Sequence, residues 1–491
     1  MMLNRVNYKA IIPIWIIGFL YILPLLITNS QYYDDIGRSV YGYFSWGIDG
    51  RPLSDLIFNF IDLGSPATDI APLPQIFSIF IMTTLCFFMH KYLNPEHKTG
   101  WLVFTPIFLS PFFIQNLAFR FDSLTMALSI AIATLPLFFM KKGTMKLFAA
   151  SAVGILFSLS LYQAALSAFV AIVCLYIIFS IKNEADSFAL LKEVITATVG
   201  MVAGYVLYAR IIIPTFVTSD YANGYNQMIG SASDLLMNVE LTKNVIGSFL
   251  TGRIADIFLF IFILSAIGLL SLIFNIFKTQ KTLSQKIINF LLLIVSLFVI
   301  ALCIPGPGLA LKNIPIGPRV FIGFGFAISL FFVLISFITI KHQPKINIVY
   351  WLAAMISFSY MATFSNAMKS QDKLAEKIIN GVTDDIIKIG YNKVMTITVD
   401  GKSLYTPVAD KAIQKLPLLK QIIPSYFDGP LAWGIVKMTE IYSGKLQPTP
   451  ARQAEIIERI CSMELITDAG LYKTYFNKGD LVISFSFRDC K

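Results

Sequence analysis

Residues 147–181 read LFAASAVGILFSLSLYQAALSAFVAIVCLYIIFSI, a run of 35 residues without one charged side chain. A bilayer core is about 30 Å thick, and a helix needs roughly 20 apolar residues to cross it. The run is therefore too long for one span and slightly short for two. Because the polar pair Tyr162-Gln163 lies near its middle, we expect two spans that turn at this pair.

The rest of the chain has the same apolar character. Of its 491 residues 56% are hydrophobic and only 14% are charged, and the mean hydropathy is +0.70. Such a chain has too little polar surface for a soluble globule, so we expect an α-helical polytopic protein embedded in a lipid bilayer. The predicted spans, about eleven, are residues 10–27, 72–89, 101–118, 123–140, 147–161, 164–181, 194–213, 257–277, 287–304, 320–340 and 346–365. Arg5 and Lys9 precede the first span, but no small-residue cleavage site follows it, so we expect that span to be retained.

Charge is distributed unevenly between the two sets of loops. Loops on the side of the N-terminus hold fourteen Lys and Arg against four acids, whereas the other loops hold seven against eleven. The positive-inside rule then makes the N-terminus cytoplasmic, and an odd number of spans puts the tail outside. The net charge of +10 comes without a basic run, so we expect no nucleic-acid partner.

The long polar segments all fall on the outer side. They are residues 28–71, 214–256 and 305–318 and the tail. Because sites are usually built on such loops, we expect residues 1–366 to form a membrane domain that works through loop 28–71.

Residues 367–491 are expected to form a small periplasmic α/β domain. Helical spacing at 372–389 and 451–461 and strand-like alternation at 393–399 and 480–487 indicate it. Cys461 and Cys490 fall in this tail, where a disulfide between them is expected if the tail is extracytoplasmic. The chain has no CxxC motif or Cys/His spacing typical of zinc, so we predict no metal site of that kind.

The first outer loop begins with adjacent carboxylates, Asp34 and Asp35, close to the end of the first span. Such a pair suits either a general base for a sugar hydroxyl or a ligand that holds a divalent cation against a phosphate. Arg38, one helical turn further on, is placed to pair with Asp35 or to bind phosphate.

Further candidates lie in the rest of that loop and in the other outer segments. Apolar residues at helical spacing after Arg38 predict amphipathic helices on the membrane surface. Arginine suits a lipid phosphate because its planar fork gives two parallel hydrogen bonds. The further phosphate candidates are Arg51, Lys312, Arg319 and, more weakly, Arg210; those for substrate binding are Trp46, Asp49, Arg120, Asp122, Tyr162 and Gln163.

Several of these segments resemble one known family. The stretch from Tyr33 to Arg38, followed by Trp46 and by Asp49-Gly50-Arg51-Pro52-Leu53, resembles the serotype-converting O-antigen glucosyltransferases of enteric bacteria and their phages. The segments 120–124, 161–163 and 318–320 resemble other outer-face motifs of that family.

The resemblance implies a glycosyltransferase C-type (GT-C) architecture in the bacterial inner membrane. It implies undecaprenyl-phosphate-linked glucose as donor and a sugar of the lipid-linked O-antigen repeat as acceptor, with inversion if a β-linked donor gives an α-linked product. Asp34 or Asp35 would be the base, and Arg38, Arg51 and Arg319 would stabilise the departing phosphate. A donor-lipid synthase and a flippase would be functional partners. No cofactor would be required, although a divalent cation such as Mg²⁺ would be compatible with the acidic pair.

Two other functions fit parts of the sequence. A flippase or transporter would share the many spans and the basic inner face, but no charged residue lies near the middle of a predicted span and no inverted repeat is visible. An O-antigen polymerase, or a transferase of mannose or aminoarabinose, would share the acidic pair. Only the family resemblance favours glucose among these sugars.

Overall fold

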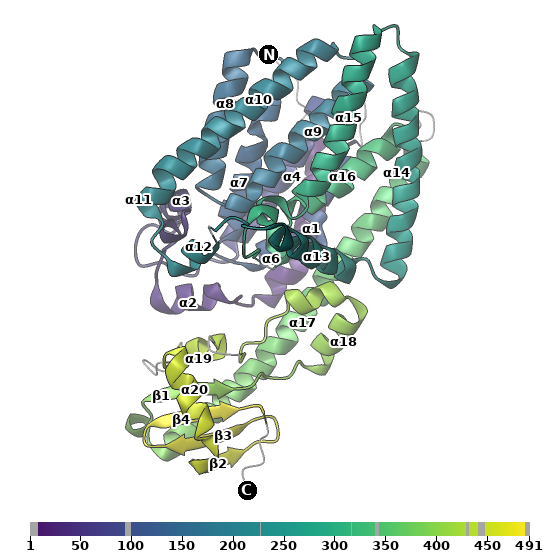
Figure 1. The fold of residues 1–491 in the computed structure, drawn as a ribbon. Coiled ribbons are helices and arrows are strands. Elements are labelled where there is room, and N and C mark those ends of the chain that lie inside the picture. Colours follow the sequence, from purple (N-terminus) through teal and green to yellow (C-terminus); the bar gives the residue numbers. More distant parts are fainter. Residues whose placement is uncertain are drawn as a thin grey trace. The chain divides into compact units, whose positions relative to one another are not determined.

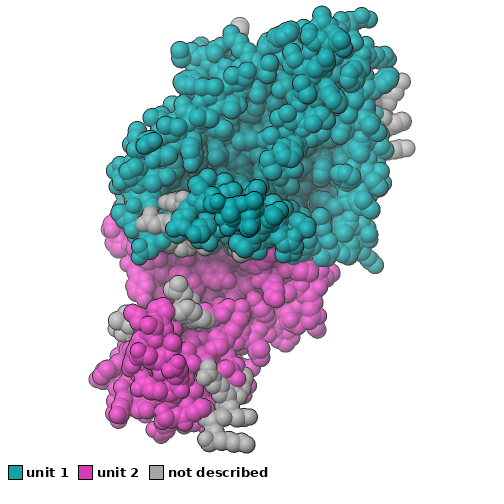
Figure 2. All heavy atoms as spheres, in the orientation of Figure 1, with its two compact units in different colours: residues 1–26, 44–64, 70–361 teal, residues 27–43, 65–69, 362–491 magenta. Residues whose placement is uncertain are grey.

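The computed structural model describes residues 8–93, 100–225, 227–315, 317–338, 343–428, 432–439 and 447–486. These residues are mostly helical and include one four-stranded sheet (Figure 1). The chain divides into two compact units (Figure 2). Unit 1 comprises Met1–Leu26, Phe44–Gly64 and Ile70–Met361; unit 2 comprises Ile27–Tyr43, Ser65–Asp69 and Ala362–Lys491.

Unit 1 is a bundle of apolar helices. Pairs such as α8 with α10, α9 with α15, and α14 with α16 pack along their lengths. Its helices are α1 (Ile12–Thr28, whose last residues belong to unit 2), α3 (Pro52–Ile61), α4 (Leu73–Leu93), α5 (Pro106–Leu109), α6 (Ile114–Ala118), α7 (Ser123–Thr134), α8 (Thr144–Leu159), α9 (Leu166–Lys182), α10 (Ser187–Leu207), α11 (Ile213–Phe216), α12 (Asp220–Tyr225), α13 (Ala232–Phe249), α14 (Gly252–Lys278), α15 (Leu283–Cys303), α16 (Ile322–Ser336) and the first part of α17 (Gln343–Ile389).

Each of the eleven predicted spans contains helix. Among the described residues, seven helices are long and apolar enough to cross a membrane, or eight if the bent pair Gly100–Leu109 and Pro111–Ala118 forms one span. The predicted spans at 123–140, 147–161 and 320–340 coincide with shorter apolar helices, Ser123–Phe139, Thr144–Leu159 and Ile322–Ser336. The structure therefore describes a membrane-spanning helical protein, and the count of eleven crossings stays a prediction.

The 35-residue apolar run turns where the sequence predicted. Helix α8 ends at Leu159, and the 3-10 turn Gln163–Ala165 leads into α9. Within the reversal, the backbone N–H of Tyr162 donates to the carbonyl oxygen of Ser158 at 2.8 Å. The shorter helix α8 and the full-length span Gln163–Lys182 are thus joined by a tight turn.

The loops that the sequence predicted to be cytoplasmic meet at one end of unit 1. The backbone N–H of Lys141 donates to Oε1 of Glu193 at 3.1 Å. The Lys281 ammonium donates to the carbonyl oxygen of Ala185. Three loops far apart in sequence, around residues 141, 186 and 281, therefore lie together.

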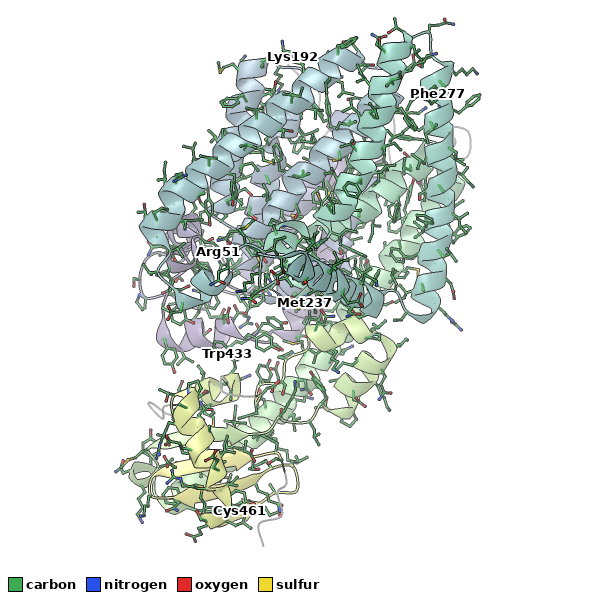
Figure 3. All side chains as sticks on the ribbon, in the orientation of Figure 1. Arg51, Lys192, Met237, Phe277, Trp433 and Cys461 are labelled. Carbon is green, nitrogen blue, oxygen red and sulfur yellow. The ribbon has the colours of Figure 1, made fainter. Side chains whose placement is uncertain are left out.

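The loops predicted to face outward meet at the opposite end of unit 1. Nε2 of Gln163 donates to the carbonyl oxygen of Asp49 at 2.8 Å, which joins the α8–α9 turn to the first outer loop. Figure 3 shows Lys192 and Arg51 at opposite ends of the helices. The loops around residues 141, 186 and 281 are thus separated from the loop around Arg51, whereas the topology and the side of the membrane that each set of loops occupies stay predictions.

Unit 2 combines helices with a mixed sheet. Its helices are α2 (Asp34–Tyr41), the remainder of α17, α18 (Pro407–Lys415), α19 (Trp433–Met438) and α20 (Pro450–Glu458). The strands β1 (Thr396–Asp400), β2 (Glu464–Asp468), β3 (Lys473–Asn477) and β4 (Asp480–Ser484) have the order β1-β4-β3-β2, with β1 parallel to β4 and the other pairs antiparallel.

The apolar core of unit 2 draws on residues distant in sequence. Ile36 of α2 is buried with Ile378 and Val382 of α17, Ile435 of α19 and Leu481 of β4. The strands and helices predicted in the tail are present. However, α17 runs without a break from Gln343 to Ile389, so the expected domain boundary at 366/367 falls inside one helix.

A close helix contact in unit 1 gives a test of the packing. A Cβ atom added at Gly268 of α14 would overlap the carbonyl oxygen of Leu334 of α16, whereas nothing lies within 4 Å of one at Gly247 of α13. Overpacking costs about 1–3 kcal/mol, so Gly268→Ala is expected to lower the unfolding temperature by a few degrees. Gly247→Ala should leave it unchanged or slightly raised, because alanine favours helix. Thermal unfolding of both variants in detergent measures this, and equal midpoints would contradict the packing.

Candidate functional site

The acidic pair of the first loop begins a short helix of unit 2. Asp34 and Asp35 occupy the first turn of α2, where the helix dipole favours negative charge. Asp35 is 0% exposed, and its Oδ2 accepts a hydrogen bond from the backbone N–H of Tyr32 at 3.2 Å. Asp34 is only half-buried. The two adjacent carboxylates therefore differ sharply in their access to a ligand.

Arg38 is held on the same helix by an aromatic side chain. Its guanidinium carbon lies 5.1 Å from the centre of the Tyr43 ring, and Nη1 donates to the Tyr43 carbonyl oxygen at 3.4 Å. A Cβ atom at Gly37 would lie 2.8 Å from the Tyr43 hydroxyl and 3.2 Å from Cζ3 of Trp433. Gly37 thus leaves room for two aromatic side chains on its side of α2, one of them from the C-terminal tail.

Helix α19 packs on α2 and brings further polar groups into unit 2. Nζ of Lys437 lies 3.6 Å from Oδ1 of Asp372, which also accepts from the hydroxyl of Tyr426 at 2.6 Å. Burial, together with the Asp372 carboxylate, raises the pKa of Tyr426 well above its ordinary value. Burial, with added repulsion from Tyr405 and Asp428, also raises the pKa of Tyr33. Both phenols are therefore protonated donors at neutral pH.

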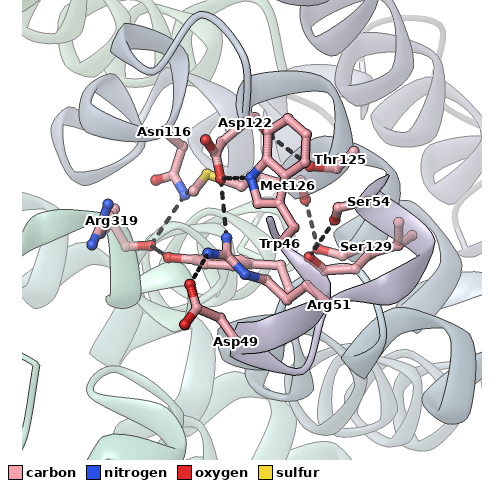
Figure 4. A network of polar contacts seen from close by, with 12 residues as sticks. Trp46, Asp49, Arg51, Ser54, Asn116, Asp122, Thr125, Met126, Ser129 and Arg319 are labelled. Atoms are coloured by element: carbon pink, nitrogen blue, oxygen red, sulfur yellow. Dashed lines mark hydrogen bonds and ion pairs between the residues drawn. The ribbon is translucent and has the colours of Figure 1, made fainter. Parts of the chain in front are cut away.

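The second half of the first loop belongs to unit 1 and forms a charged network (Figure 4). Nη1 of Arg51 donates to Oδ1 of Asp122 at 3.0 Å, and its Nη2 lies 3.6 Å from Oδ2 of Asp49. Nε1 of Trp46 donates to the same Asp122 oxygen at 2.8 Å. The side chains of Arg51 and Asp122 are 16% and 6% exposed, so the pair is largely withdrawn from water.

Asp55 fixes the backbone that carries this network. Its two carboxylate oxygens accept from the backbone N–H groups of Trp46 and Gly47 at 2.8 and 2.6 Å. The Trp46 ring then packs with Phe58 and Phe121 in a small buried cluster. The indole N–H is thereby aimed at Asp122, which lies next to Phe121 in the chain.

The α8–α9 turn and a distorted part of the helix after α10 hold the other side of the loop. Tyr208 begins a π-helical segment, Tyr208–Ile212, and such wide turns often mark functional sites. Its hydroxyl accepts from Nε2 of Gln163 and donates to the carbonyl oxygen of Gly50, both at 3.0 Å. Gly50 has φ +81°, and a Cβ there would lie 2.6 Å from the Tyr208 hydroxyl. The close approach thus requires glycine.

A fourth loop joins through the backbone of Arg319, in the 3-10 turn Pro318–Val320. The Arg319 carbonyl oxygen accepts from Nδ2 of Asn116 at 3.1 Å and from the Tyr162 hydroxyl at 3.2 Å, and its N–H donates to Oε1 of Gln115 at 2.9 Å. The guanidinium lies over the ring of Phe119, 4.6 Å from its centre. Figure 4 shows it pointing away from the Arg51–Asp122 pair.

The predicted site residues fall into three groups. Those joined in the network of unit 1 are Trp46, Asp49, Arg51, Asp122, Tyr162, Gln163 and the backbone of Arg319. Asp34, Asp35 and Arg38 lie on α2 of unit 2. Arg120 is buried in the turn beside Asp122, whereas Arg210 and Lys312 are exposed and are not part of this hydrogen-bonded network as far as the structure describes it.

Sequence reasoning missed several members of these groups. Asp55 accepts from the backbone N–H of Gly47, eight residues earlier in the chain. Ser219 donates to Oδ1 of Asp49 at 2.6 Å. Tyr208 joins the network through the π-helical turn. Trp433 reaches α2 only through tertiary packing. Of these residues, only Asp55 lies close in the chain to the group it binds, the backbone of Gly47. Cys490 lies outside the described residues, so the disulfide with Cys461 stays a prediction.

Chemically, unit 2 offers the half-buried carboxylate of Asp34, which follows the half-buried Tyr33 in the chain. Unit 1 offers Arg51, which is shared by the carboxylates of Asp49 and Asp122, and the loop that carries Arg319. In the described ranges, no group of three or more His, Cys, Asp or Glu side chains is placed to hold a metal ion. The role of Mg²⁺ therefore stays open as a prediction.

Comparison with known proteins adds the family. Residues 23–330 match the model of the family described as glucosyl transferase GtrII, which is more than half of the chain. The chain is also 31% identical over 443 residues to a protein of Salmonella phage P22, described as an uncharacterized 55.3 kDa protein in the gtrB 5′ region, covering 88% of this chain and 90% of the relative. No solved structure matches the chain. As the outer-loop motifs predicted, the chain belongs to the glucosyl transferase GtrII family.

Proposed function

We propose that this protein transfers glucose from polyprenyl phosphate to a sugar of the O-antigen on the outer face of the bacterial inner membrane. Family membership supports a glucosyltransferase. The observation that carries the rest is the network around Arg51 and Asp122, which ties four polar loops together at one end of a bundle of apolar helices. A sugar linked to a lipid would present its phosphate and its ring at such a boundary. Neither the family nor this network favours the flippase alternative.

The reaction is a single displacement at C1 of the glucose. The acceptor hydroxyl oxygen attacks C1, the bond between C1 and the phosphate oxygen breaks, and polyprenyl phosphate departs with the bonding electrons. The hydroxyl proton passes to a carboxylate base. One displacement inverts the configuration at C1. The donor has to be made and carried to the outer face first, so a donor-lipid synthase and a flippase are the proposed partners.

Among the two acidic residues of α2, we assign the base to Asp34. A general base must reach the hydroxyl proton to within hydrogen-bond distance. Asp35 is fully buried and accepts from the Tyr32 backbone, so a sugar hydroxyl has no access to it in this conformation. Asp34 is half-buried, at the first residue of the helix. Asp35 then serves to hold the first turn of α2.

For the donor phosphate we favour Arg319 over Arg51. Arg51 already divides its guanidinium between two carboxylates, and removing it would leave Asp122 buried without this counter-charge. Arg319 has its backbone fixed by Gln115, Asn116 and Tyr162, while the guanidinium packs on an aromatic face. Such an arrangement presents a planar fork in a fixed place, as phosphate recognition requires. An arginine in this role would make a divalent cation unnecessary.

We assign acceptor binding to unit 2 and to Trp433 in particular. Trp433 is half-buried and packs beside Gly37 on the helix that carries Asp34. Tryptophan combines a broad apolar face with an N–H donor, which suits the apolar face and hydroxyl rim of a pyranose ring. The acceptor sugar would then lie next to the proposed base.

Replacing Asp34 with asparagine tests the base. General-base catalysis contributes about 10²- to 10⁴-fold, so Asp34→Asn is expected to lower kcat by that factor while the protein remains folded in the membrane. Asp384→Asn, at an exposed carboxylate of α17, is the matched control and should retain full turnover. The assay follows radiolabelled glucose from polyprenyl phosphate to lipid-linked O-antigen. Normal turnover in both Asp34→Asn and Asp35→Asn would show that the general base does not lie on α2.

Replacing Arg319 with alanine tests the phosphate contact. Hydrogen bonds to a charged group are worth about 1.5–3 kcal/mol, so kcat/KM for the donor should fall roughly 10- to 100-fold. Arg319→Lys should recover part of this loss, since a charge without the fork remains. Arg210→Ala, at an exposed arginine, should stay within a few-fold of the unsubstituted protein. A fall in kcat/KM for the donor in Arg210→Ala but not in Arg319→Ala would contradict the assignment of the phosphate to Arg319.

Replacing Trp433 tests the acceptor site. Trp433→Ala should raise KM for the acceptor about tenfold and leave KM for the donor unchanged, because only one substrate would touch the ring. Trp433→Phe should retain an intermediate affinity. Val436→Ala, on the same helix and also packed against the core of unit 2, controls for loosened packing. An equal rise in both KM values, or the same effect in Val436→Ala, would make Trp433 purely structural.

A further inference from the structure

Helix α13 is an element of unit 1 to which the proposed reaction assigns no role. It spans Ala232–Phe249 and starts at a capping box, in which Ser231 and Asp234 each accept from the backbone of the other. Only two residues separate its end from the start of α14 at Gly252. Figure 1 shows α13 lying crosswise at the lower ends of α14 and α15.

One face of α13 holds it to the rest of unit 1. Asn238, Thr242, Val245 and Phe249 are its buried residues. Nδ2 of Asn238 donates to the carbonyl oxygens of Leu309 and Leu311 at 3.2 and 2.7 Å. Phe249 contacts aromatic rings of three other segments, Phe112, Phe324 and Tyr360. The helix is therefore fixed in orientation rather than loosely attached.

Beside the buried face runs an apolar stripe that the described protein does not fully cover. Leu235, Val239, Ile246 and Leu250 recur at intervals of four and seven residues, which places them on one side of the helix. Leu235, Val239 and Leu250 are exposed and Ile246 is half-buried. Beyond Leu250 the chain passes the exposed charged residues Arg253 and Asp256 before the exposed apolar residues of α14, such as Leu259 and Phe262, begin.

The rest of the surface of α13 is more polar. The outward ridge carries the exposed Leu236 and also Glu240 and Lys243, whose charged groups lie 3.0 Å apart. The shoulder opposite the apolar stripe carries Met237, Asn244 and Ser248. The helix thus presents three different sides, to protein, to an apolar medium and to water.

The length of α14 fixes the depth of α13. Helix α14 has 27 residues, of which an 18-residue stretch reaches a mean hydropathy of 2.9, and at 1.5 Å per residue its full length is about 40 Å, close to the thickness of a bilayer with its headgroup regions. Its first residue therefore lies at the bilayer boundary, and α13 ends two residues before it. A crosswise helix at that depth meets lipid on one side and water on the other.

We propose that α13 is a membrane-surface helix that binds the headgroup and upper acyl region of the bilayer through Leu235, Val239, Ile246 and Leu250. The position of α13, two residues before the start of the membrane-spanning helix α14, selects lipid as the occupant of this stripe. Through Asn238 the helix also holds residues 309–311, so it sets the depth of the loop that leads to Arg319. This assignment does not depend on the proposed reaction.

Spin labels on the two shoulders of α13 test the assignment. Val239→Cys and Asn244→Cys are labelled separately in the full chain, in nanodiscs of phosphatidylethanolamine and phosphatidylglycerol. Collision with oxygen, which concentrates in acyl chains, is compared with collision with a water-soluble nickel chelate. The Val239 label should collide several-fold more with oxygen than with nickel, and the Asn244 label should show the reverse.

Controls make each outcome decisive. Leu259→Cys on α14 gives the value for a lipid-facing label, and the unsubstituted protein gives the background from its own cysteines. Should Val239→Cys fail to fold, Leu235→Cys takes its place on the same stripe. Equal nickel access at both shoulders would overturn the proposal. Shielding of the Val239 label from both reagents, relieved on dilution, would overturn it in favour of a protein partner.

Discussion

The pairing of Arg51 with Asp122 constrains the rest of unit 1 more than any other contact. Both side chains are largely withdrawn from water at the end of a bundle of apolar helices. A buried charge that loses its partner costs about 3–5 kcal/mol, so neither residue can move far without the other. The pair therefore locks the first outer loop onto the turn before α7, and Trp46 adds a third group to the same carboxylate oxygen. The contacts of Gln163, Tyr208 and Asp49 build outward from that fixed point.

Local sequence patterns were sufficient for the apolar helices. Runs of apolar residues and the polar pair at Tyr162 located the helical segments and the turn, because both depend on neighbours in the chain. The same holds for β1 and β4, which are rich in apolar residues and in which every residue after the first is buried. Strand β2 escaped notice since its residues are mostly exposed and show no alternation. Its conformation depends on pairing with β3 rather than on its own side chains.

The candidate site was only partly accessible to such patterns. Asp49, Arg51 and Asp122 could be predicted as site residues because charged residues are rare in this chain and these three lie in its outer loops. Tyr208 lies inside an apolar helix, and only the π-helical turn brings its hydroxyl to Gly50. Likewise, nothing near residue 433 signals that a tryptophan there will meet a helix near residue 37. Contacts between residues hundreds of positions apart produce no periodic pattern in the sequence, so they could not be predicted from it.

The order of the sheet in unit 2 also governs when the protein can be completed during synthesis. Strand β4 lies between β1 and β3 although it is the last of the four to be made. The core it closes includes Ile36, on the helix that bears Asp34 and Asp35. Helices α17 and α19, which share that core with α2, are made earlier, but the core is complete only once the ribosome has passed residue 484, some 450 residues after the acidic pair. A shortened chain that lacks this strand would lose the centre of the sheet, and the helix that bears the acidic pair would then pack against an incomplete core.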